Sequence, residues 1–335
     1  MHRGRSPVSL TAAAVRAVVA ALAVAVLSAA RPAVALELQG HRGARGLAPE
    51  NTIAAFERAL AIGVDVLEMD VGLTADGVVV VAHDPALNPA ITRDASGRFL
   101  TGRGPAIRSL TLAQLQTYDV GRVDPSSAYG RSLATQQGRD GERIPTLAAV
   151  FARVAALGSD VRFSIETKLS PTEPEETADP ETLVRALLEV VRRAGMGERV
   201  VVQSFDWRTL AVVRALAPAI PTVHLTSTTG GGRNITADGA WTTGLRSNDF
   251  ASVPHLVKAA GGAIWSPNVR NLTEADLATA RSLGLRTVPW TVNDPADMER
   301  LVDWGVDGII SDHPDRLRAV MARRGLPLPR PVAAP

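Results

Sequence analysis

From residue 37 onward, short runs of β-branched residues alternate with longer segments in which apolar residues recur every three or four positions. The first pattern is typical of buried strands and the second of amphipathic helices. Strands are predicted at 36–41, 64–71, 78–83, 161–168, 199–205, 221–226, 263–267, 286–292 and 307–311. Helices are predicted between them, most clearly at 52–63, 182–195, 209–218, 274–284 and 296–305. This alternation, sustained over about 280 residues, favours an α/β fold of the (β/α)8 TIM-barrel type over a two-domain enzyme.

The second and third strand-like runs are joined only by the turn TADG, residues 74–77. A parallel crossover needs a dozen or more residues, so these two runs must form an antiparallel hairpin. The nine predicted strands therefore comprise eight barrel strands and one returning hairpin strand. Asp70 and His83 lie almost equidistant from the turn, so both are predicted at the carboxyl-terminal mouth, where barrel enzymes hold their chemistry.

Two polar, glycine-rich stretches interrupt the alternation. Residues 84–144 are interpreted as a polar insertion over the carboxyl-terminal mouth rather than a second domain, and residues 227–249 as a loop at the same rim. Either stretch could gate the substrate or be a flexible surface excursion. The predicted boundaries are a barrel domain at 36–325 and a proline-rich tail at 326–335.

Residues 1–35 have the pattern of an export signal: arginines precede the apolar run 17–30, and small residues at 33–35 allow cleavage after Ala35. The apolar run is too short to favour a spanning helix, and an uncleaved anchor is the alternative. Because the chain has no cysteine, lipidation after the signal and disulfides are both excluded. We therefore expect a secreted or extracytoplasmic protein with no stable membrane insertion once the signal is removed.

The charge balance argues against a nucleic-acid partner. The full chain has a formal net charge of +2, but residues 1–35 hold four of its arginines and no acidic residue. The mature chain would then carry 32 basic and 34 acidic residues. Binding to nucleic acid calls for a clustered basic face, so a small-molecule substrate is expected instead.

Carboxylates recur at strand ends in this sequence. Glu68 and Asp70 lie two positions apart on one predicted strand, so their side chains share a face, and Glu166 and Lys168 repeat the spacing on another. On an interior face, neighbouring carboxylates stay ionised together only beside a cation, whereas on a solvent-facing rim they would simply pair with arginines. Oxygen ligands suit a hard divalent cation, Ca²⁺ or Mg²⁺, better than zinc.

Three further side chains are candidates for chemistry. The chain has 34 arginines but only two lysines, so Lys168 suggests a compact ammonium that binds an anionic oxygen. His41 and His83 each end a predicted strand near the carboxylates, and histidine exchanges protons near neutral pH.

A divalent cation, two histidines and neighbouring positive charges are the groups that phosphodiester cleavage requires. One histidine takes the proton from the attacking oxygen, and the other protonates the leaving oxygen. The same groups also suit a metal-dependent aldolase or isomerase, and spacing alone does not separate these reactions.

Several motifs resemble the glycerophosphodiester phosphodiesterase family, in its secreted bacterial type. They extend from about residue 37 to about residue 320 and are HRGARGLAPENTIAAFERALAIGVDVLEMDVGLTADGVVVVAHD, SLTLAQLQTYDVG, IPTLAAVFA, SIETK, PWTVND and GVDGIISDHPDRL. The resemblance implies a barrel enzyme that hydrolyses glycerophosphodiesters, such as deacylated phospholipids, to an alcohol and sn-glycerol 3-phosphate. In such enzymes the 2-hydroxyl of glycerol often attacks phosphorus, and water then opens the cyclic phosphate.

By the same resemblance, His41 and His83 are the acid/base pair. Glu68, Asp70 and Glu166 match the metal ligands of the family, with Ca²⁺ or Mg²⁺ as the usual ion. These five residues form the predicted catalytic and metal-binding set.

Four more residues are implied to bind the substrate. Arg42 and Lys168 match phosphate-binding positions, and Trp290 matches an aromatic wall for glycerol, with core packing as the alternative. Glu50 is placed beside the substrate pocket, although it would also fit as an acid near the start of a helix. Asn51 or Thr52 is predicted to cap that helix.

Two other functions fit parts of the pattern. One is a phospholipase-like enzyme or a hydrolase of envelope polymers with glycerophosphate links, but the polar loop 227–249 offers no apolar surface for a lipid. The other is a non-catalytic barrel that binds glycerophosphates. That function predicts a missing ligand or histidine, and every one is present in the sequence.

Overall fold

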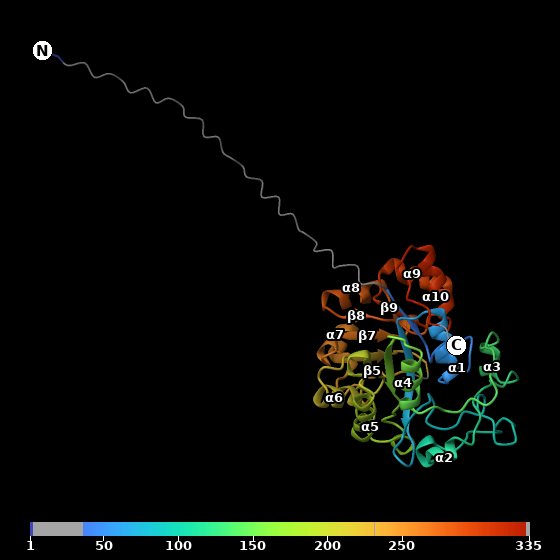
Figure 1. The fold of residues 1–335 in the computed structure, drawn as a ribbon. Helices are drawn as coiled ribbons and strands as arrows, with labels where there is room; N and C mark the ends of the chain where they lie inside the picture. The colour runs from blue at the N-terminus through green and yellow to red at the C-terminus, as the bar shows by residue number, and fades with distance from the viewer. Residues whose placement is uncertain (3–35, 231, 333–335) are drawn as a thin grey trace. The chain divides into compact units, whose positions relative to one another are not determined.

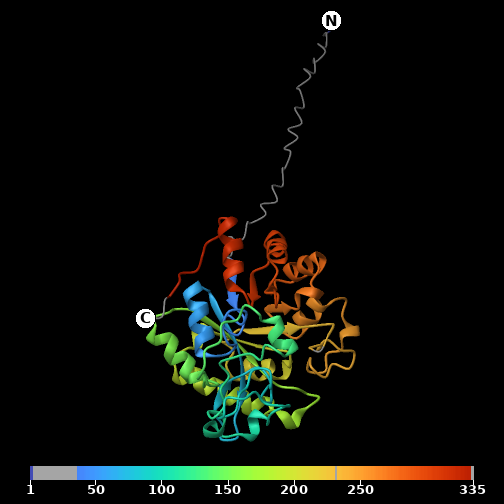
Figure 2. The same cartoon turned by 90° about the vertical axis from the view of Figure 1, so that its right-hand side faces the viewer.

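In the computed structural model, nine strands in the described part of the chain form one sheet that curls into a barrel with helices around it (Figures 1 and 2). The structure describes residues 1–2, 36–230 and 232–332. The strands are β1 (Glu37–Gly40), β2 (Val66–Leu73), β3 (Val79–Val81), β4 (Arg162–Thr167), β5 (Val200–Ser204), β6 (Thr222–Thr226), β7 (Ile264–Pro267), β8 (Arg286–Thr287) and β9 (Gly308–Ser311). Every predicted strand is present, and the (β/α)8 barrel is confirmed.

The barrel strands follow the order β8-β7-β6-β5-β4-β2-β1-β9, and every neighbouring pair is parallel. Backbone hydrogen bonds join the two ends of this order: the amide of Asp307 donates to Thr287 O at 2.9 Å, and that of Ile310 donates to Pro289 O at 3.0 Å. The barrel is therefore closed by the segment that continues β8. As a regular ladder β8 is shorter than the predicted strand at 286–292.

The helices pack on the outside of the strands, as the connections of parallel strands require. Those of the barrel are α1 (Ile53–Ile62), α4 (Leu147–Ala156), α5 (Pro180–Arg193), α6 (Trp207–Leu216), α7 (Val253–Ala259), α8 (Glu274–Ser282), α9 (Pro295–Trp304) and α10 (Pro314–Arg323). Short 3₁₀ turns are η1 (Ile107–Ser109), η2 (Pro174–Glu176), η3 (Gly197–Arg199), η4 (Ser247–Asp249) and η5 (Val269–Asn271).

The predicted hairpin is confirmed. β2 and β3 pair antiparallel, with Val71 opposite Val81 and Leu73 opposite Val79. Beyond the ladder, the amide of Ala82 donates to Asp70 O at 3.0 Å, so His83 follows directly beside Asp70. The hairpin thus brings these two residues to the same end of the barrel.

The alternation of side chains along each strand builds two hydrophobic layers. Leu38 on β1 packs into the larger layer, between the strands and the helices, whereas the next residue, Gln39, lines the inside of the barrel. The smaller layer fills the barrel and consists of Val223, Ile264, Val288 and Ile310, with Val201 and Trp290 packed against it. Alternate residues of a strand therefore face the helices or the inside of the barrel.

Helix α1 is capped at its start by Thr52, whose side-chain oxygen accepts from the amide of Ala55 at 3.2 Å, and at its end by Gly63, where φ is 88°. Of the two predicted caps, Thr52 is the one that the structure shows. Phe56 and Leu60 are buried as expected. Asn51 has a different role, described below.

The insertion, residues 84–144, has a small apolar core although its sequence is rich in polar residues and glycine. It contains α2 (Leu112–Leu115), α3 (Ala128–Ser132) and η1, and it appears in both views as the teal-to-green segment at one end of the barrel (Figures 1 and 2). Its apolar side chains gather on Val80 of β3 into a separate small core that consists of Leu87, Ile107, Leu115, Val120 and Ile144. This core fixes the insertion to the outer face of the hairpin.

The predicted signal segment, apart from residues 1–2, lies outside the described residues. At the other end, part of the predicted tail returns to the barrel, because the amide of Val332 donates to Leu60 O at 2.8 Å and Arg318 donates to Pro329 O at 2.7 Å. Among the helices of the described residues, none is both long enough and apolar enough to cross a bilayer.

Candidate active site

A cavity of about 230 Å³, open to solvent, lies at the carboxyl ends of the barrel strands. Its lining combines charged and polar side chains with apolar ones. The lining residues are His41, Arg42, Arg45, Glu68, His83, Glu166, Gln203, Phe205, Leu225, Trp290, Thr291 and Ile310. Residues on or directly after β1 to β6, after β8 and on β9 therefore converge on one pocket.

Three carboxylates from adjacent strands meet beside this cavity. Glu68 and Asp70 lie on β2, and the register of β2 with β4 places Asp70 opposite Glu166. One oxygen of each carboxylate lies within 4.8 Å of the others, and all three residues are buried. The period of two along each strand puts them on the same inner face.

The crowding of these carboxylates shifts their proton affinities. Burial, together with the charges of Asp70 and Glu166, raises the pKa of Glu68 well above its usual range. Burial also raises the pKa of Glu166 to about 7. Although burial favours a protonated Asp70, His83, Arg42 and Lys168 hold the pKa of that carboxyl below its usual range. The cluster thus has more negative charge than its own cations balance.

The donor set fits a hard divalent cation. All three groups are carboxylates, which Ca²⁺ and Mg²⁺ prefer, and the chain has no cysteine to recruit a softer metal. Asp70 Oδ1 is buried and accepts no hydrogen bond from the described residues. A buried carboxylate oxygen without a donor is costly, and a bound cation would satisfy it.

Two cations border the carboxylates. Lys168 Nζ lies 2.6 Å from Glu166 Oε1 and 3.6 Å from Asp70 Oδ1. Arg42 donates from its amide to Glu68 Oε2 at 2.7 Å, and its Nε lies 3.3 Å from Asp70 Oδ2. Both predicted phosphate-binding residues therefore lie beside the carboxylates that could hold a metal.

The backbone of the first loop brings Arg42 into this position. Arg42 has a φ of 50° and Gly43 one of 85°, so the chain turns sharply after β1. A Cβ on Gly43 would lie 2.6 Å from the backbone of Ala55, which leaves no room for a side chain. Glycine at this position lets the loop pack directly on α1.

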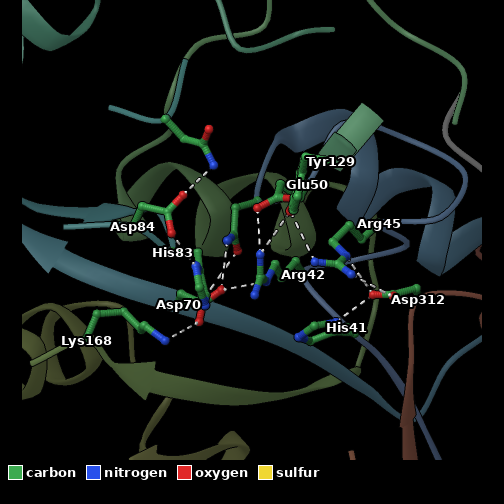
Figure 3. Close-up of polar contacts among 12 residues, drawn as sticks. His41, Arg42, Arg45, Glu50, Asp70, His83, Asp84, Tyr129, Lys168 and Asp312 are labelled. Carbon is green, nitrogen blue, oxygen red and sulfur yellow. Dashed lines mark hydrogen bonds and ion pairs between the residues drawn. The ribbon is translucent and has the colours of Figure 1, made fainter. Parts of the chain in front are cut away.

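His41 is oriented by a carboxylate from the opposite end of the chain. Its Nδ1 lies 2.6 Å from Asp312 Oδ1, and its Nε2 lies 3.9 Å from Glu68 Oε2 (Figure 3). Asp312 directly follows β9, the neighbour of β1. It also forms an ion pair with Arg45 and accepts a hydrogen bond from Asn293. Burial lowers the pKa of His41, while Asp312 opposes that shift.

His83 has a carboxylate partner of its own. Its Nδ1 lies 2.8 Å from Asp84 Oδ1, and Asn88 donates to the other oxygen of Asp84 at 2.8 Å. Burial and the charges of Arg42 and Lys168 lower the pKa of His83 to about 4. In the view of Figure 3, Arg42 lies between His83 and His41.

The other two predicted substrate contacts have different surroundings. Trp290 lines the cavity, packs edge to face on Phe205 at 5.2 Å, and donates from its indole to Ser266 O. Glu50 is buried, precedes helix α1 and accepts a hydrogen bond from Arg42 Nη1 at 2.7 Å. Glu50 lies behind Arg42 and does not line the cavity, so its contact is with the arginine.

Several residues of the site were missed by sequence reasoning. They are Arg45, Asn51, Asp84, Tyr129, Gln203, Asn293 and Asp312. Asn51 holds Asp70, donating from Nδ2 to its carboxylate at 2.9 Å and accepting from its amide, and Gln203 donates to Glu68 Oε1 at 2.7 Å. A signal was available for Asp312, because it ends the last strand and a closed barrel sets that strand beside β1.

Residues 41–316 match the model of the glycerophosphoryl diester phosphodiesterase family. The chain is similar to the glycerophosphodiester phosphodiesterase of Bacillus subtilis, with 32% identity over 84% of each chain. It is also similar to the glycerophosphodiester phosphodiesterase of Caldanaerobacter subterraneus, with 30% identity over 85% of this chain and 97% of the relative.

Solved structures show the same fold. A Silicibacter pomeroyi protein with a provisional glycerophosphoryl diester phosphodiesterase name superposes with a TM-score of 0.78 and 37% identity, over 88% of this chain and 95% of the other. A phosphodiesterase of Oleispira antarctica, solved in complex with the product sn-glycerol-3-phosphate, has a TM-score of 0.64 and 22% identity, over 86% of this chain and 97% of the other. The second likeness concerns the fold alone.

Proposed function

The chain belongs to the glycerophosphoryl diester phosphodiesterase family, and from this premise we propose that it is a phosphodiesterase that hydrolyses glycerophosphodiesters to an alcohol and sn-glycerol 3-phosphate. We assign proton transfer to His41 and His83, and divalent-cation binding to Glu68, Asp70 and Glu166. Arg42 and Lys168 are assigned to the phosphate group.

One observation carries this proposal: two histidines, each tied to a carboxylate through Nδ1, border a single cavity beside three clustered carboxylates. When Nδ1 donates to an aspartate, the remaining nitrogen, Nε2, is free to accept a proton. Two such imidazoles suit a reaction that removes a proton from one oxygen and delivers a proton to another.

The charges of the cavity suit a phosphodiester. In the part of the chain that the structure describes, Arg42 Nη2 has no hydrogen-bond partner, whereas Nη1 is held by Glu50. That leaves Nη2 to donate to a phosphoryl oxygen, and Lys168 offers a second positive charge nearby. A divalent cation, when bound to the carboxylates, supplies a Lewis acid for the charge that develops on phosphorus oxygens.

The proposal is tested by measuring release of sn-glycerol 3-phosphate from glycerophosphocholine and glycerophosphoethanolamine. The protein is first treated with chelator, and Ca²⁺ or Mg²⁺ is then added back. We expect activity that chelator abolishes and one of the two ions restores. His255→Ala is a control variant and should behave as wild type, since His255 lies on α7, hydrogen-bonds the hydroxyl of Ser252 just before that helix, and does not line the cavity.

Other outcomes identify the competing functions. Equal or faster turnover of a lysophospholipid or a polyglycerophosphate would replace the proposed substrate class with lipids or envelope polymers. Binding of glycerol 3-phosphate without any hydrolysis, in the presence of either ion, would instead indicate a non-catalytic binding barrel.

Export of the chain is a separate proposal, based on the signal pattern of residues 1–35. Expression of the full chain followed by fractionation and amino-terminal sequencing tests it. We expect the protein outside the cytoplasm with cleavage after Ala35, and a protein that keeps residues 1–35 would contradict the cleavage.

A further inference from the structure

Tyr129 connects the middle of the insertion to two arginines that line the cavity. Tyr129 lies on the short helix α3 within the insertion, and its hydroxyl donates to Glu50 Oε2. The same hydroxyl lies 3.1 Å from Arg45 Nη1 and 3.4 Å from Arg42 Nη1 (Figure 3). A single oxygen from the insertion therefore contacts two cationic side chains of the cavity and the carboxylate between them.

These contacts form a chain that ends at the phosphate-binding arginine. Tyr129 holds one oxygen of Glu50, and the other oxygen of Glu50 accepts from Arg42 Nη1 at 2.7 Å. Arg45 also lies over the Tyr129 ring, with its guanidinium carbon 5.5 Å from the centroid. Charge-assisted hydrogen bonds of this kind fix the orientation of a guanidinium more firmly than its own rotamer preferences do.

Further contacts of the same segment hold the loop that carries these arginines. Thr135 donates from its hydroxyl to Gly46 O at 2.8 Å, and Gln136 donates from its side chain to Arg45 O at 2.9 Å. The amide of Gln137 donates to Leu47 O at 2.9 Å. The insertion is thus fastened along residues 45–47, and Tyr129 is the member of that seam that faces the cavity side chains.

We propose that Tyr129 is a positioning residue for phosphate binding, which acts through Glu50 to hold the guanidinium of Arg42 in the cavity. The inference rests on the proposed function to the extent that Arg42 binds the phosphate group. It assigns the insertion a specific role, the alignment of Arg42 and Arg45. No sequence motif pointed to this role.

The chain contains a matched control, because it has only two tyrosines. Tyr118 also lies in the insertion, but it packs against the small core around Val80. We compare Tyr129→Phe with Tyr118→Phe, since each removes one hydroxyl and keeps the ring. The readouts are the Kd of inorganic phosphate by calorimetry, the thermal midpoint, and KM and kcat for glycerophosphocholine.

We expect Tyr129→Phe to weaken phosphate binding about tenfold and to raise KM more than it lowers kcat, whereas Tyr118→Phe matches wild type. In a Glu50→Gln background the same substitution should change the Kd less than twofold, because the hydroxyl then has no carboxylate to hold. A Tyr129→Phe protein with wild-type phosphate affinity, or an equal tenfold loss with and without Glu50, would overturn the proposal.

A second measurement does not require Tyr129 to be changed. Tyr118→Phe leaves Tyr129 as the only tyrosine, so protein grown with ring-labelled tyrosine gives one ring signal by NMR. Phosphate should shift that signal with the Kd found by calorimetry, and an unshifted signal at saturation contradicts the proposal. If no variant or wild-type protein releases glycerol 3-phosphate, the proposed function fails, while the phosphate affinities still decide the role of Tyr129.

Discussion

The two histidines occupy differently built sides of one cavity. On one side, Asp312 is buried and His41 is nearly so, with 2% and 12% of their side chains exposed, and Arg45 and Asn293 hold Asp312 as well. On the other side, His83 and Asp84 are exposed by 31% and 34%, and Asn88 is the additional support for Asp84. The first pair is fixed by several elements of the barrel, and the second depends on the hairpin and the start of the insertion.

This difference in exposure predicts which imidazole depends more strongly on its aspartate. A buried pair held by several partners has one arrangement, and removal of any partner leaves a charge without compensation. A half-exposed pair can exchange a lost partner for water. We therefore expect equal need for the two histidines but unequal need for their aspartates.

The largest effect is expected from substitution of the two histidines and of Glu68. His41→Ala, His83→Ala and Glu68→Ala should each lower kcat/KM by about 10³-fold or more, because each removes a proton carrier or a cation ligand. Activity is measured as glycerol 3-phosphate release, and circular dichroism checks the fold. Retained activity in any of the three would refute the site assignment.

The aspartates should separate the two sides. Asp312→Asn is expected to lower kcat/KM about 100-fold, and Asp84→Asn only about tenfold, since carboxylates that orient a functional imidazole contribute in that range. Asp315→Asn, an exposed position at the start of α10, is the matched control and should match wild type. Equal losses for Asp312→Asn and Asp84→Asn would show that burial does not distinguish the two pairs.

A smaller effect is expected beneath the histidines, inside the barrel. Gln203 donates to Glu68 Oε1, whereas Gln39 donates to Glu37 Oε2 at 3.1 Å, away from the carboxylate cluster. Gln203→Met should weaken binding of Ca²⁺ or Mg²⁺ about tenfold, and Gln39→Met should leave it unchanged. Calorimetric titration of the chelated protein with each ion measures both, and an unchanged affinity for Gln203→Met contradicts the expectation.

The smallest effect concerns stability against pH in the metal-free protein. The pKa of folded His83 is lowered to about 4 from 6.5, so the unfolded chain takes up a proton between these values that the folded chain does not. The free energy of unfolding should therefore fall as the pH falls from 6.5 to 4. In His83→Gln that decline should be smaller by about 1–2 kcal/mol.

Urea unfolding at several pH values between 7.5 and 4 measures the decline. Asp84, whose folded pKa is lowered to about 2 from 3.8, contributes to the decline only near pH 4, where its carboxyl begins to take up a proton in the unfolded chain. His255→Gln is a control for loss of a surface imidazole. Identical curves for His83→Gln and wild type would mean that His83 takes up protons equally in both states.

The strand-borne part of this site could be predicted from the sequence. Buried parallel strands are near-continuous β-branched runs, and a period of two decides which side chains face inward, so Glu68, Asp70 and Glu166 follow from their spacing. The hairpin followed from a turn too short for a crossover, and it brought His83 to Asp70. The strand predicted at 286–292 is longer than the ladder that the structure shows. The ladder is short because the backbone hydrogen bonds of the segment after β8 alternate between two neighbouring strands.

The loop-borne part could not be predicted in this way. Asn51 holds Asp70 with a φ of 55°, a conformation that no periodic pattern encodes. Tyr129 lies in a stretch with little regular structure, whose position depends on apolar residues that look scattered in the sequence. Side chains on such segments have directions set by tertiary contacts, which the order of residues alone does not reveal.

The pairing of β1 with β9 has a consequence for how the protein becomes active during its synthesis. His41 leaves the ribosome near the start of the barrel, whereas Asp312 and Asn293 belong to its last strand and the segment before it. A nascent chain that ends before residue 290 has all three clustered carboxylates but lacks the partner of His41 Nδ1. Translation must therefore pass Asp312 before the carboxylate that orients His41 exists, and proteolytic loss of β9 and the residues after it would leave His41 without that partner.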